Sequence, residues 1–392
     1  MARTLICGGR LITPDGILNG HKLLIENEKI AAILTPGAAT PMDAAMVDVA
    51  GQYVSPGFVD IHQHGGGGSD YMDTDADAYY HALSAHLAHG ATSVMPTLLS
   101  AGVENTVRAA KQYVQALQDP RIRTNLLGLH MEGLFISPMQ AGAQNPDCIK
   151  EFDEKDYTAI YDAAEGHLAR WSVAPELPGA EQFARFAANK GFKLSIAHSN
   201  ADFDTVLRAY DWGFHHVTHL YSGMSTVSRK GGFRIAGVLE AAYYLDDMEV
   251  EIIADGCHLP YSLLKLVTKL KKPGTVALIT DAMRAAGQNV QESILGSGED
   301  AMPVIIEDGV AKLPSREAFA GSIATADRLV RTMVAAGTPL TEAVRMASEY
   351  PLRMMGIGGK GTLAPGYDAD ICVFDENIHV SAVFVKGQQA EL

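Results

Sequence analysis

From about residue 53 onward, short apolar runs alternate with amphipathic segments of helical period, and this alternation constrains the fold more than any other feature. Segments between the runs are typical of helices, such as 179–190 before Gly191 and 201–212 before Gly213, since glycine commonly ends a helix. Eight strand–helix units predict an α/β protein built on a (β/α)₈ TIM-like barrel. The expected strands are 56–62, 92–97, 125–132, 170–175, 193–198, 214–219, 250–255 and 276–281.

The two ends of the chain depart from this pattern. Residues 1–54 contain short alternating runs separated by turn signals at 14–16 and 19–20, and residues 361–392 do likewise. We therefore expect both ends to combine into one small β-sandwich domain, made of residues 1–54 and 355–392. The catalytic barrel would then span residues 55–354, and a chain of 392 residues is long enough for both parts.

Composition narrows the possible partners. The formal charge of −15, from 31 Lys and Arg against 46 Asp and Glu, argues against nucleic acid and anionic membranes. It leaves room for a phosphorylated small molecule, which needs only a local basic pocket. No apolar run approaches the roughly 20 residues of a membrane span. The N-terminus lacks the long apolar core of a signal peptide, and the four cysteines have no paired spacing, so we expect a cytoplasmic protein.

Polar side chains follow the apolar runs at the points where the runs end. His62 and His64 are two residues apart, which places both imidazoles on one face of a strand. Active sites of such barrels lie at the C-terminal ends of the strands. Imidazoles and carboxylates together suit Zn²⁺ or Fe²⁺. We predict a centre for one divalent ion, or for two bridged by Glu132, formed by His62, His64, Glu132, His198, His219 and Asp281.

Several of these positions have a second interpretation. Asp281 could cap the next helix, but its place at the end of the last strand favours a catalytic acid–base role. His130 shares a face with Glu132, and we expect it to pack inside the barrel. The turn Ala320-Gly321-Ser322 either binds an anion at a helix N-terminus or is simply a turn and cap. The basic loop 228–234 either binds an anion or is solvated.

These motifs resemble the amidohydrolase superfamily and, within it, the N-acetylglucosamine-6-phosphate deacetylase family. The combination of Glu132 in a His-x-Glu-Gly motif with His-Ser-Asn-Ala and Thr-His-Leu-Tyr is specific for this branch. The closing Gly-Thr-Leu-Ala-Pro-Gly run is common to the superfamily. The resemblance runs nearly end to end, through residues 56–65, 130–133, 141–144, 197–201, 218–221, 253–258, 280–282, 320–322, 348–351 and 361–370.

The resemblance implies roles for individual residues. Glu132, His198 and His219 would hold one divalent ion, and His62 with His64 would allow a second. Asp281 would act first as general base and then as general acid on the acetamide of an amino sugar 6-phosphate. A homodimer is also implied. The substrate would be bound by Gln144, Ser222, Gly223, Lys230, Arg234, His258, Ala320, Gly321 and Ser322.

Two departures from the family pattern concern phosphate binding. Ser222 stands where the family usually has Asn, and the following loop lacks the usual Arg-Glu-Pro-Gly motif, whose arginine binds phosphate, sometimes across a dimer interface. Lys230 or a neighbouring arginine, such as Arg234, must take that role here. Arginine and lysine are not equivalent at such a site. The altered loop keeps alternatives open: a cyclic amidase, a deacetylase of another N-acyl amino sugar, or a non-catalytic scaffold.

Overall fold

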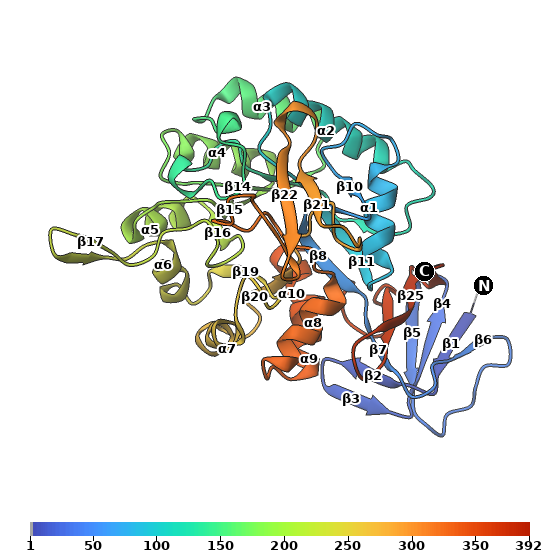
Figure 1. The fold of residues 1–392 in the computed structure, drawn as a ribbon. Coiled ribbons are helices and arrows are strands. Elements are labelled where there is room, and N and C mark those ends of the chain that lie inside the picture. Colours follow the sequence, from blue (N-terminus) through green and yellow to red (C-terminus); the bar gives the residue numbers. More distant parts are fainter. Residues whose placement is uncertain (1–2) are drawn as a thin grey trace.

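A barrel of eight parallel strands forms the centre of the computed structural model, which describes residues 3–392 (Figure 1). Each strand pairs with the next around the circle, and the circle closes where the backbone N–H of Asp281 donates to the carbonyl oxygen of His62 at 2.9 Å. The predicted barrel is confirmed. Its strands are β8 Phe58–Gln63, β11 Ala91–Leu98, β13 Leu129–Glu132, β14 Leu168–Val173, β15 Lys193–Ile196, β16 Phe214–Val217, β19 Glu249–Ile253 and β20 Val276–Ile279.

One predicted strand is divided. Residues 125–132 form β12 Asn125–Leu126 and then β13, with a break at Gly128. Gly128 has a φ of 117°, and a Cβ there would lie 2.5 Å from the Cβ of Ala169. Only glycine allows the chain to approach its neighbour this closely, so the backbone leaves and rejoins the sheet at this point.

Helices cover the outside of the barrel, one after each strand, and turn their apolar faces to it. Helix α4 begins close to the predicted position and ends at Gly191, whose φ is 83°. Helix α5 begins later than predicted because the Asp202 side chain accepts the N–H of Thr205 at 2.9 Å and caps it. The barrel helices are α1 Ala78–Leu87, α2 Val103–Ala116, α3 Glu154–Ala163, α4 Ala180–Lys190, α5 Phe203–Asp211, α6 Val238–Tyr244, α7 Tyr261–Leu270 and α8 Ala326–Ala335, followed by α9 Leu340–Met346 and α10 Glu349–Met354.

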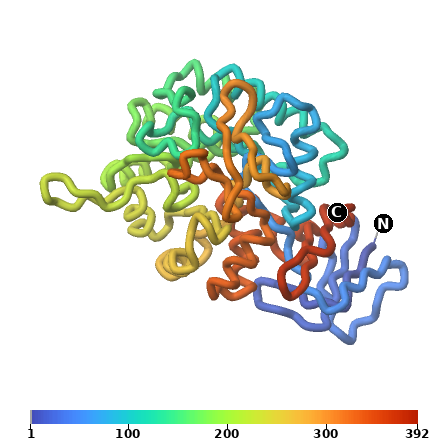
Figure 2. The backbone as a smooth tube through the Cα atoms, in the orientation of Figure 1, coloured from blue at the N-terminus to red at the C-terminus, as the bar shows by residue number. Residues whose placement is uncertain are grey.

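The two chain ends lie side by side in a small β-sandwich beside the barrel, as predicted (Figure 2). One sheet has the order β5-β4-β1-β6, and the other has the order β26-β25-β24-β7-β2-β3. A separate apolar cluster that includes Leu11, Val54 and Phe384 fills the space between them. The strands are β1 Arg3–Cys7, β2 Arg10–Thr13, β3 Gly16–Asn19, β4 Lys22–Glu26, β5 Lys29–Leu34, β6 Ala45–Asp48, β7 Tyr53–Pro56, β24 Ile371–Phe374, β25 Val380–Val385 and β26 Gln388–Gln389.

Two insertions in the barrel bear on the site. The antiparallel sheet of β21 Glu292–Leu295, β22 Met302–Glu307 and β23 Val310–Lys312 follows β20 and lies across the front of the barrel in Figure 1. The hairpin of β17 Ser228–Lys230 and β18 Phe233–Ile235 projects away from the body of the molecule. A short hairpin of β9 Gly65–Gly66 and β10 Ser69–Asp70 follows β8.

Within residues 3–392, no helix combines the length and the hydrophobicity that crossing a membrane requires.

Candidate metal centre and active site

The six predicted metal-centre residues come together at one end of the barrel. His62 lies in β8, Glu132 is the last residue of β13, and the others follow directly after their strands. All six are at least nine-tenths buried. His198, His219 and Asp281 have φ values of 45°, 31° and 48°, in the left-handed region that such residues rarely adopt. Strained backbone of this kind clusters at functional sites, because it turns a side chain where regular structure would not.

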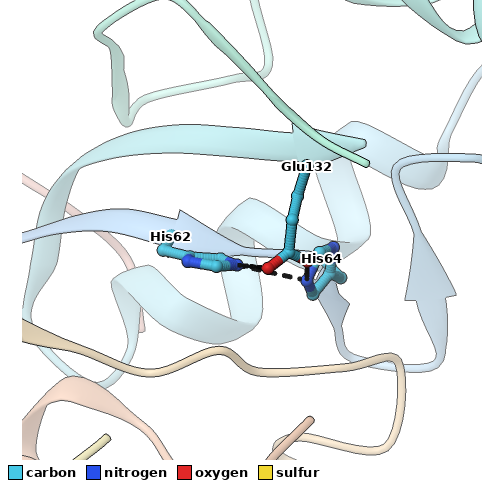
Figure 3. Close-up of side chains that lie close together, drawn as sticks. All are labelled: His62, His64 and Glu132. Carbon is cyan, nitrogen blue, oxygen red and sulfur yellow. Dashed lines mark hydrogen bonds and ion pairs between the residues drawn. The ribbon is translucent and has the colours of Figure 1, made fainter. Parts of the chain in front are cut away.

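Glu132 is the hub of the cluster. Its Oε1 lies 2.8 Å from Nε2 of His219 and 3.4 Å from Nε2 of His198. The other oxygen, Oε2, lies 3.2 Å from Nε2 of His64, and Oε1 is 3.6 Å from Nε2 of His62. Figure 3 shows the His62 and His64 rings converging on this carboxylate. Two overlapping groups could therefore hold an ion, one made of His62, His64 and Glu132 and the other of Glu132, His198 and His219.

The far sides of the rings show which nitrogen faces the centre as a ligand. Nδ1 of His64 lies 3.2 Å from the carbonyl oxygen of Thr97, and Nδ1 of His198 lies 2.7 Å from that of Gln140. A carbonyl oxygen only accepts, so each Nδ1 carries a proton, and the neutral ring presents a lone pair on Nε2. Such a hydrogen bond from the second ring nitrogen is the usual support of a metal-binding histidine.

The donor set fits a divalent transition metal. Nε2 of His62 and Nε2 of His64 face one another at 3.3 Å. Their lone pairs would repel at that distance, so either ring protons or a metal ion must lie between the rings and the carboxylates, and imidazole with carboxylate is a set that Zn²⁺ and Fe²⁺ accept. Burial raises the pKa of Glu132, but the surrounding histidines lower it well below its ordinary value, so this ligand is an anion.

Asp281 is held by backbone contacts on both sides. Its N–H donates to His62, and its carbonyl oxygen accepts the N–H of Ser322 at 2.7 Å. Its Oδ1 lies 3.1 Å from Nε2 of His64 and 3.5 Å from Nε2 of His62. The alternative role as a helix cap is wrong, because the next helix, α8, begins at Ala326 after Thr325. The carboxylate instead faces the same space as the metal-centre imidazoles.

A pocket of about 190 Å³ opens onto the centre. Its walls include five of the predicted substrate-binding residues: Gln144, Ser222, Gly223, His258 and Gly321. Five metal-centre residues form its base, and the remaining wall is mainly small and apolar. The sequence analysis had assigned no substrate contact to these remaining residues, because apolar loop residues carry no chemical signature. These further residues are Leu99, Gly142, Ala143, Leu295, Ala318 and Phe319.

Two of the predicted substrate residues are held by hydrogen bonds to other protein groups. Gln144 donates from Nε2 to Oε2 of Glu132 at 3.0 Å and accepts the N–H of Ser100 at 2.9 Å, so its amide orients the central carboxylate. Nδ1 of His258 lies 2.9 Å from Oδ2 of Asp255, whose Oδ1 accepts the backbone N–H of His258 at 2.8 Å. This pairing leaves Nε2 of His258 available to a ligand in the pocket.

The turn at 320–322 supports Asp281 from behind. Ala320 is fully buried, and neither it nor Ser322 lines the pocket. The Ser322 hydroxyl donates to the carbonyl oxygen of Thr280 at 2.5 Å. Gly321 has a φ of 66°, and a Cβ there would lie 2.8 Å from the carbonyl oxygen of Asp281. The segment forms a tight turn, and α8 begins only four residues later, at Ala326.

Lys230 and Arg234 are placed apart from the other predicted residues. Both lie in the projecting β17–β18 hairpin, whose six strand residues are all exposed, and neither lines the pocket. Arg234 donates to the carbonyl oxygen of Gly232 within the hairpin, at 3.1 Å. The chain on its own does not bring these cations to the metal centre.

A charged layer lies beneath the centre. His130 packs inside the barrel as predicted, with its ring centroid 4.8 Å from that of His62. Arg170 and Glu251, both fully buried, contact the same two histidines. Sequence analysis missed this pair, although Arg170 is the one charged residue of β14 and Glu251 lies between Val250 and Ile252 in β19, a pattern that could have marked both.

Comparison with known proteins shows which family the chain resembles along its length. The amidohydrolase family matches residues 53–390. An N-acetylgalactosamine-6-phosphate deacetylase of Escherichia coli O157:H7 is 32% identical, with 97% of each chain covered. An N-acetylglucosamine-6-phosphate deacetylase of Lysinibacillus sphaericus is 31% identical, with 93% of this chain and 92% of that protein covered.

Solved structures agree over the full length. A mutant N-acetyl-D-glucosamine-6-phosphate deacetylase of Mycobacterium smegmatis, in complex with N-acetyl-D-glucosamine-6-phosphate, has a TM-score of 0.90 at 29% identity and covers 99% of both chains. The corresponding enzyme of Pasteurella multocida has a TM-score of 0.91 at 26% identity, with full coverage of both. By sequence, fold and site together, this chain belongs to the amidohydrolase family.

Proposed function

We propose that the protein is a metal-dependent deacetylase, which hydrolyses the acetamide of N-acetylglucosamine 6-phosphate to glucosamine 6-phosphate and acetate. The observation that carries the proposal is the position of Asp281. Its Oδ1 lies 3.1 Å from a metal-centre imidazole, in the wall of a pocket of about 190 Å³. The relatives named as deacetylases of this sugar phosphate and of its galactosamine counterpart support the same chemistry.

The proposed reaction uses few groups. A divalent ion at the centre supplies Lewis acidity, which lowers the pKa of water and polarises an amide carbonyl. Asp281 takes the proton from the attacking water and later passes it to the leaving amine. Gln144 keeps Glu132 oriented through the 3.0 Å hydrogen bond. His258, fixed by Asp255, offers Nε2 to an oxygen of the substrate or of the developing oxyanion.

The ion is Zn²⁺ or Fe²⁺ in this proposal, because the ligands are imidazole and carboxylate. One ion would be held by Glu132, His198 and His219, and a second by His62, His64 and Glu132. The sugar would contact three residues that line the pocket, Ser222, Gly223 and Gly321. We assign Ala320 and Ser322 to the support of that wall and of Asp281, since the Ser322 hydroxyl is already engaged.

The phosphate would be bound by Lys230 or Arg234. Because their hairpin projects from the body of the chain, we propose a homodimer in which the hairpin of one subunit reaches the pocket of the other. Phe233 at the tip of this hairpin is 77% exposed, which suits burial against a second subunit. We further propose that residues 1–54 and 355–392 act as one domain beside the catalytic barrel 55–354, and that the enzyme works in the cytoplasm.

A second candidate substrate has a specific basis. The E. coli relative at 32% identity is named for N-acetylgalactosamine 6-phosphate, the 4-epimer. Acetate release should therefore be measured on both epimers with the metal-reconstituted protein. A higher kcat/KM for the gluco epimer supports the proposal. A higher value for the galacto epimer would move the assignment to that sugar, and inactivity on both with metal bound would overturn it.

A further inference from the structure

A buried ion pair crosses the barrel interior directly beneath His62. Arg170 projects from β14 and Glu251 from β19, and neither side chain is exposed to solvent. Nη1 of Arg170 pairs with Oε1 of Glu251. The other oxygen of Glu251 lies 3.1 Å from Nδ1 of His62. The pair therefore lies on the side of the His62 ring that faces away from the pocket.

Arg170 gives the layer a fixed direction of hydrogen bonding. Its Nη2 donates to the carbonyl oxygen of Ile61 and to Nδ1 of His130, both at 3.0 Å. A guanidinium has no acceptor, so His130 must carry its proton on Nε2, which lies 2.7 Å from the Ser172 hydroxyl. Arg170 thus holds the backbone of β8 just before His62 and fixes one neighbouring imidazole as neutral.

Glu251 fixes the other imidazole. Its Oε1 pairs with the guanidinium of Arg170, which stays protonated, so the group is a carboxylate. A carboxylate only accepts, and it therefore requires a proton on Nδ1 of His62. When a metal ion displaces the second proton of the ring, the lone pair of His62 is therefore on Nε2, toward Glu132 and His64.

Stability alone does not explain a buried pair of this kind. Desolvation of two charges often cancels their attraction, and well-packed apolar residues commonly replace such pairs without loss of stability. A carboxylate behind a metal-binding histidine has a clear use, because it fixes the tautomer and raises the basicity of the ligand. The contacts of Glu251 and Arg170 match that use.

We propose that Glu251 and Arg170 are positioning residues for one of two divalent ions, the ion held by His62, His64 and Glu132. The inference rests on the proposed metal-dependent function. No side-chain hydrogen bond or ion pair joins Arg170 or Glu251 to Glu132, His198 or His219, and His198 is supported from Gln140 instead. Glu251 reaches this group only through its carbonyl oxygen, which accepts the N–H of Leu220, next to His219, at 2.8 Å. The pair therefore governs one ion and leaves the other unaffected.

The test compares the two ions in one protein. Glu251→Gln keeps the size of the side chain, removes the charge, and turns an amide N–H₂ toward Arg170 or His62. We expect affinity for the ion held by His62, His64 and Glu132 to fall about 10- to 100-fold. Affinity for the other ion should stay within about twofold. Chelator competition with Zn²⁺ measures both affinities, and the Co²⁺ absorption spectrum shows which site empties. Glu249→Gln, on the same strand and without contact to His62, is the matched control.

A second variant separates positioning from folding. Replacing Arg170 and Glu251 together by Met removes both charges and leaves neither unpaired, so the barrel should fold and bind one equivalent of metal instead of two. Equal loss at both sites, no loss at either, or a single ion in the wild type would overturn the inference. Two ions that respond as expected, without acetate release from any sugar phosphate, would contradict the proposed function alone.

Discussion

Gly223 lies against the imidazole of His198, so closely that a Cβ on Gly223 would stand 2.8 Å from Nδ1. That nitrogen is the one that donates to the carbonyl oxygen of Gln140 at 2.7 Å. The loop after β16 therefore contacts the ligand formed after β15 and helps to hold it in place. Gly223 also has a φ of 55°, which a residue with a side chain adopts at a cost.

Gly223→Ala should consequently weaken metal binding by the group of Glu132, His198 and His219. We expect a loss of about 10- to 100-fold in affinity for that ion, because the supporting hydrogen bond of His198 breaks. Chelator competition measures the affinity for this ion. Gly166→Ala is the control, since Gly166 has a φ of 82° with open space around it and shares only the backbone strain. Equal metal affinities in the two variants would refute the steric argument.

Asp281→Asn should lower kcat by at least about 10²-fold, because the amide can neither take a proton from water nor return one to the amine. Metal content should remain largely intact, since the four histidines and Glu132 are unchanged. Acetate release and metal analysis on the same sample measure the two effects. Asp211→Asn, at the exposed end of α5, should change neither. Near-normal turnover in the Asp281 variant would show that the assigned base is wrong.

Metal affinity should rise with pH from neutrality to about pH 9. Burial lowers the pKa of His62, but Glu132 and the other carboxylates raise it to about 10 in the metal-free protein. Burial likewise lowers the pKa of His64, and Asp281 and Glu132 raise it to about 9. At neutral pH both rings hold an extra proton that a metal ion must displace, so binding releases protons. Proton release into a weakly buffered solution during Zn²⁺ titration measures this effect, and an affinity independent of pH would contradict it.

Lys230→Ala and Arg234→Ala should raise KM for the phosphorylated sugar, by about tenfold for the residue that contacts phosphate, with little change in kcat. The same variants should leave KM for the unphosphorylated sugar unaltered. Arg185→Ala, on the exposed face of α4, controls for loss of a surface charge. An unchanged KM in both hairpin variants would remove the hairpin from the phosphate site. Light scattering on the same proteins measures whether the chain is a dimer.

The sequence was most informative where a residue was both polar and placed at the end of an apolar run. Glu132, His198 and Asp281 are polar and end apolar runs, and a barrel brings all such ends together, so their convergence could be predicted before any coordinates. The left-handed backbone of His198 and Asp281 could not be predicted, because it depends on the contacts around each turn. The direction of the Ser322 side chain could not be predicted either. Its hydroxyl donates to the carbonyl oxygen of Thr280 and does not enter the pocket.

Other parts of the site depend on contacts between segments that are distant in the sequence. Arg170 and Glu251 are 81 residues apart and meet only across the closed barrel. The exposure of Lys230 depends on how far its hairpin extends from the fold, which composition does not determine. Leu295 enters the pocket wall because it belongs to β21 of the inserted sheet, and Leu99 because it follows barrel strand β11, and nothing in the residue type indicates either position.

Acetate release from N-acetylglucosamine 6-phosphate, measured beside the unphosphorylated sugar on metal-reconstituted protein, tests the central claim most directly. We expect one acetate and one free amine per substrate molecule, with a strong preference for the phosphorylated sugar. Failure to release acetate from either sugar, with metal bound at the six-residue centre, would contradict the account.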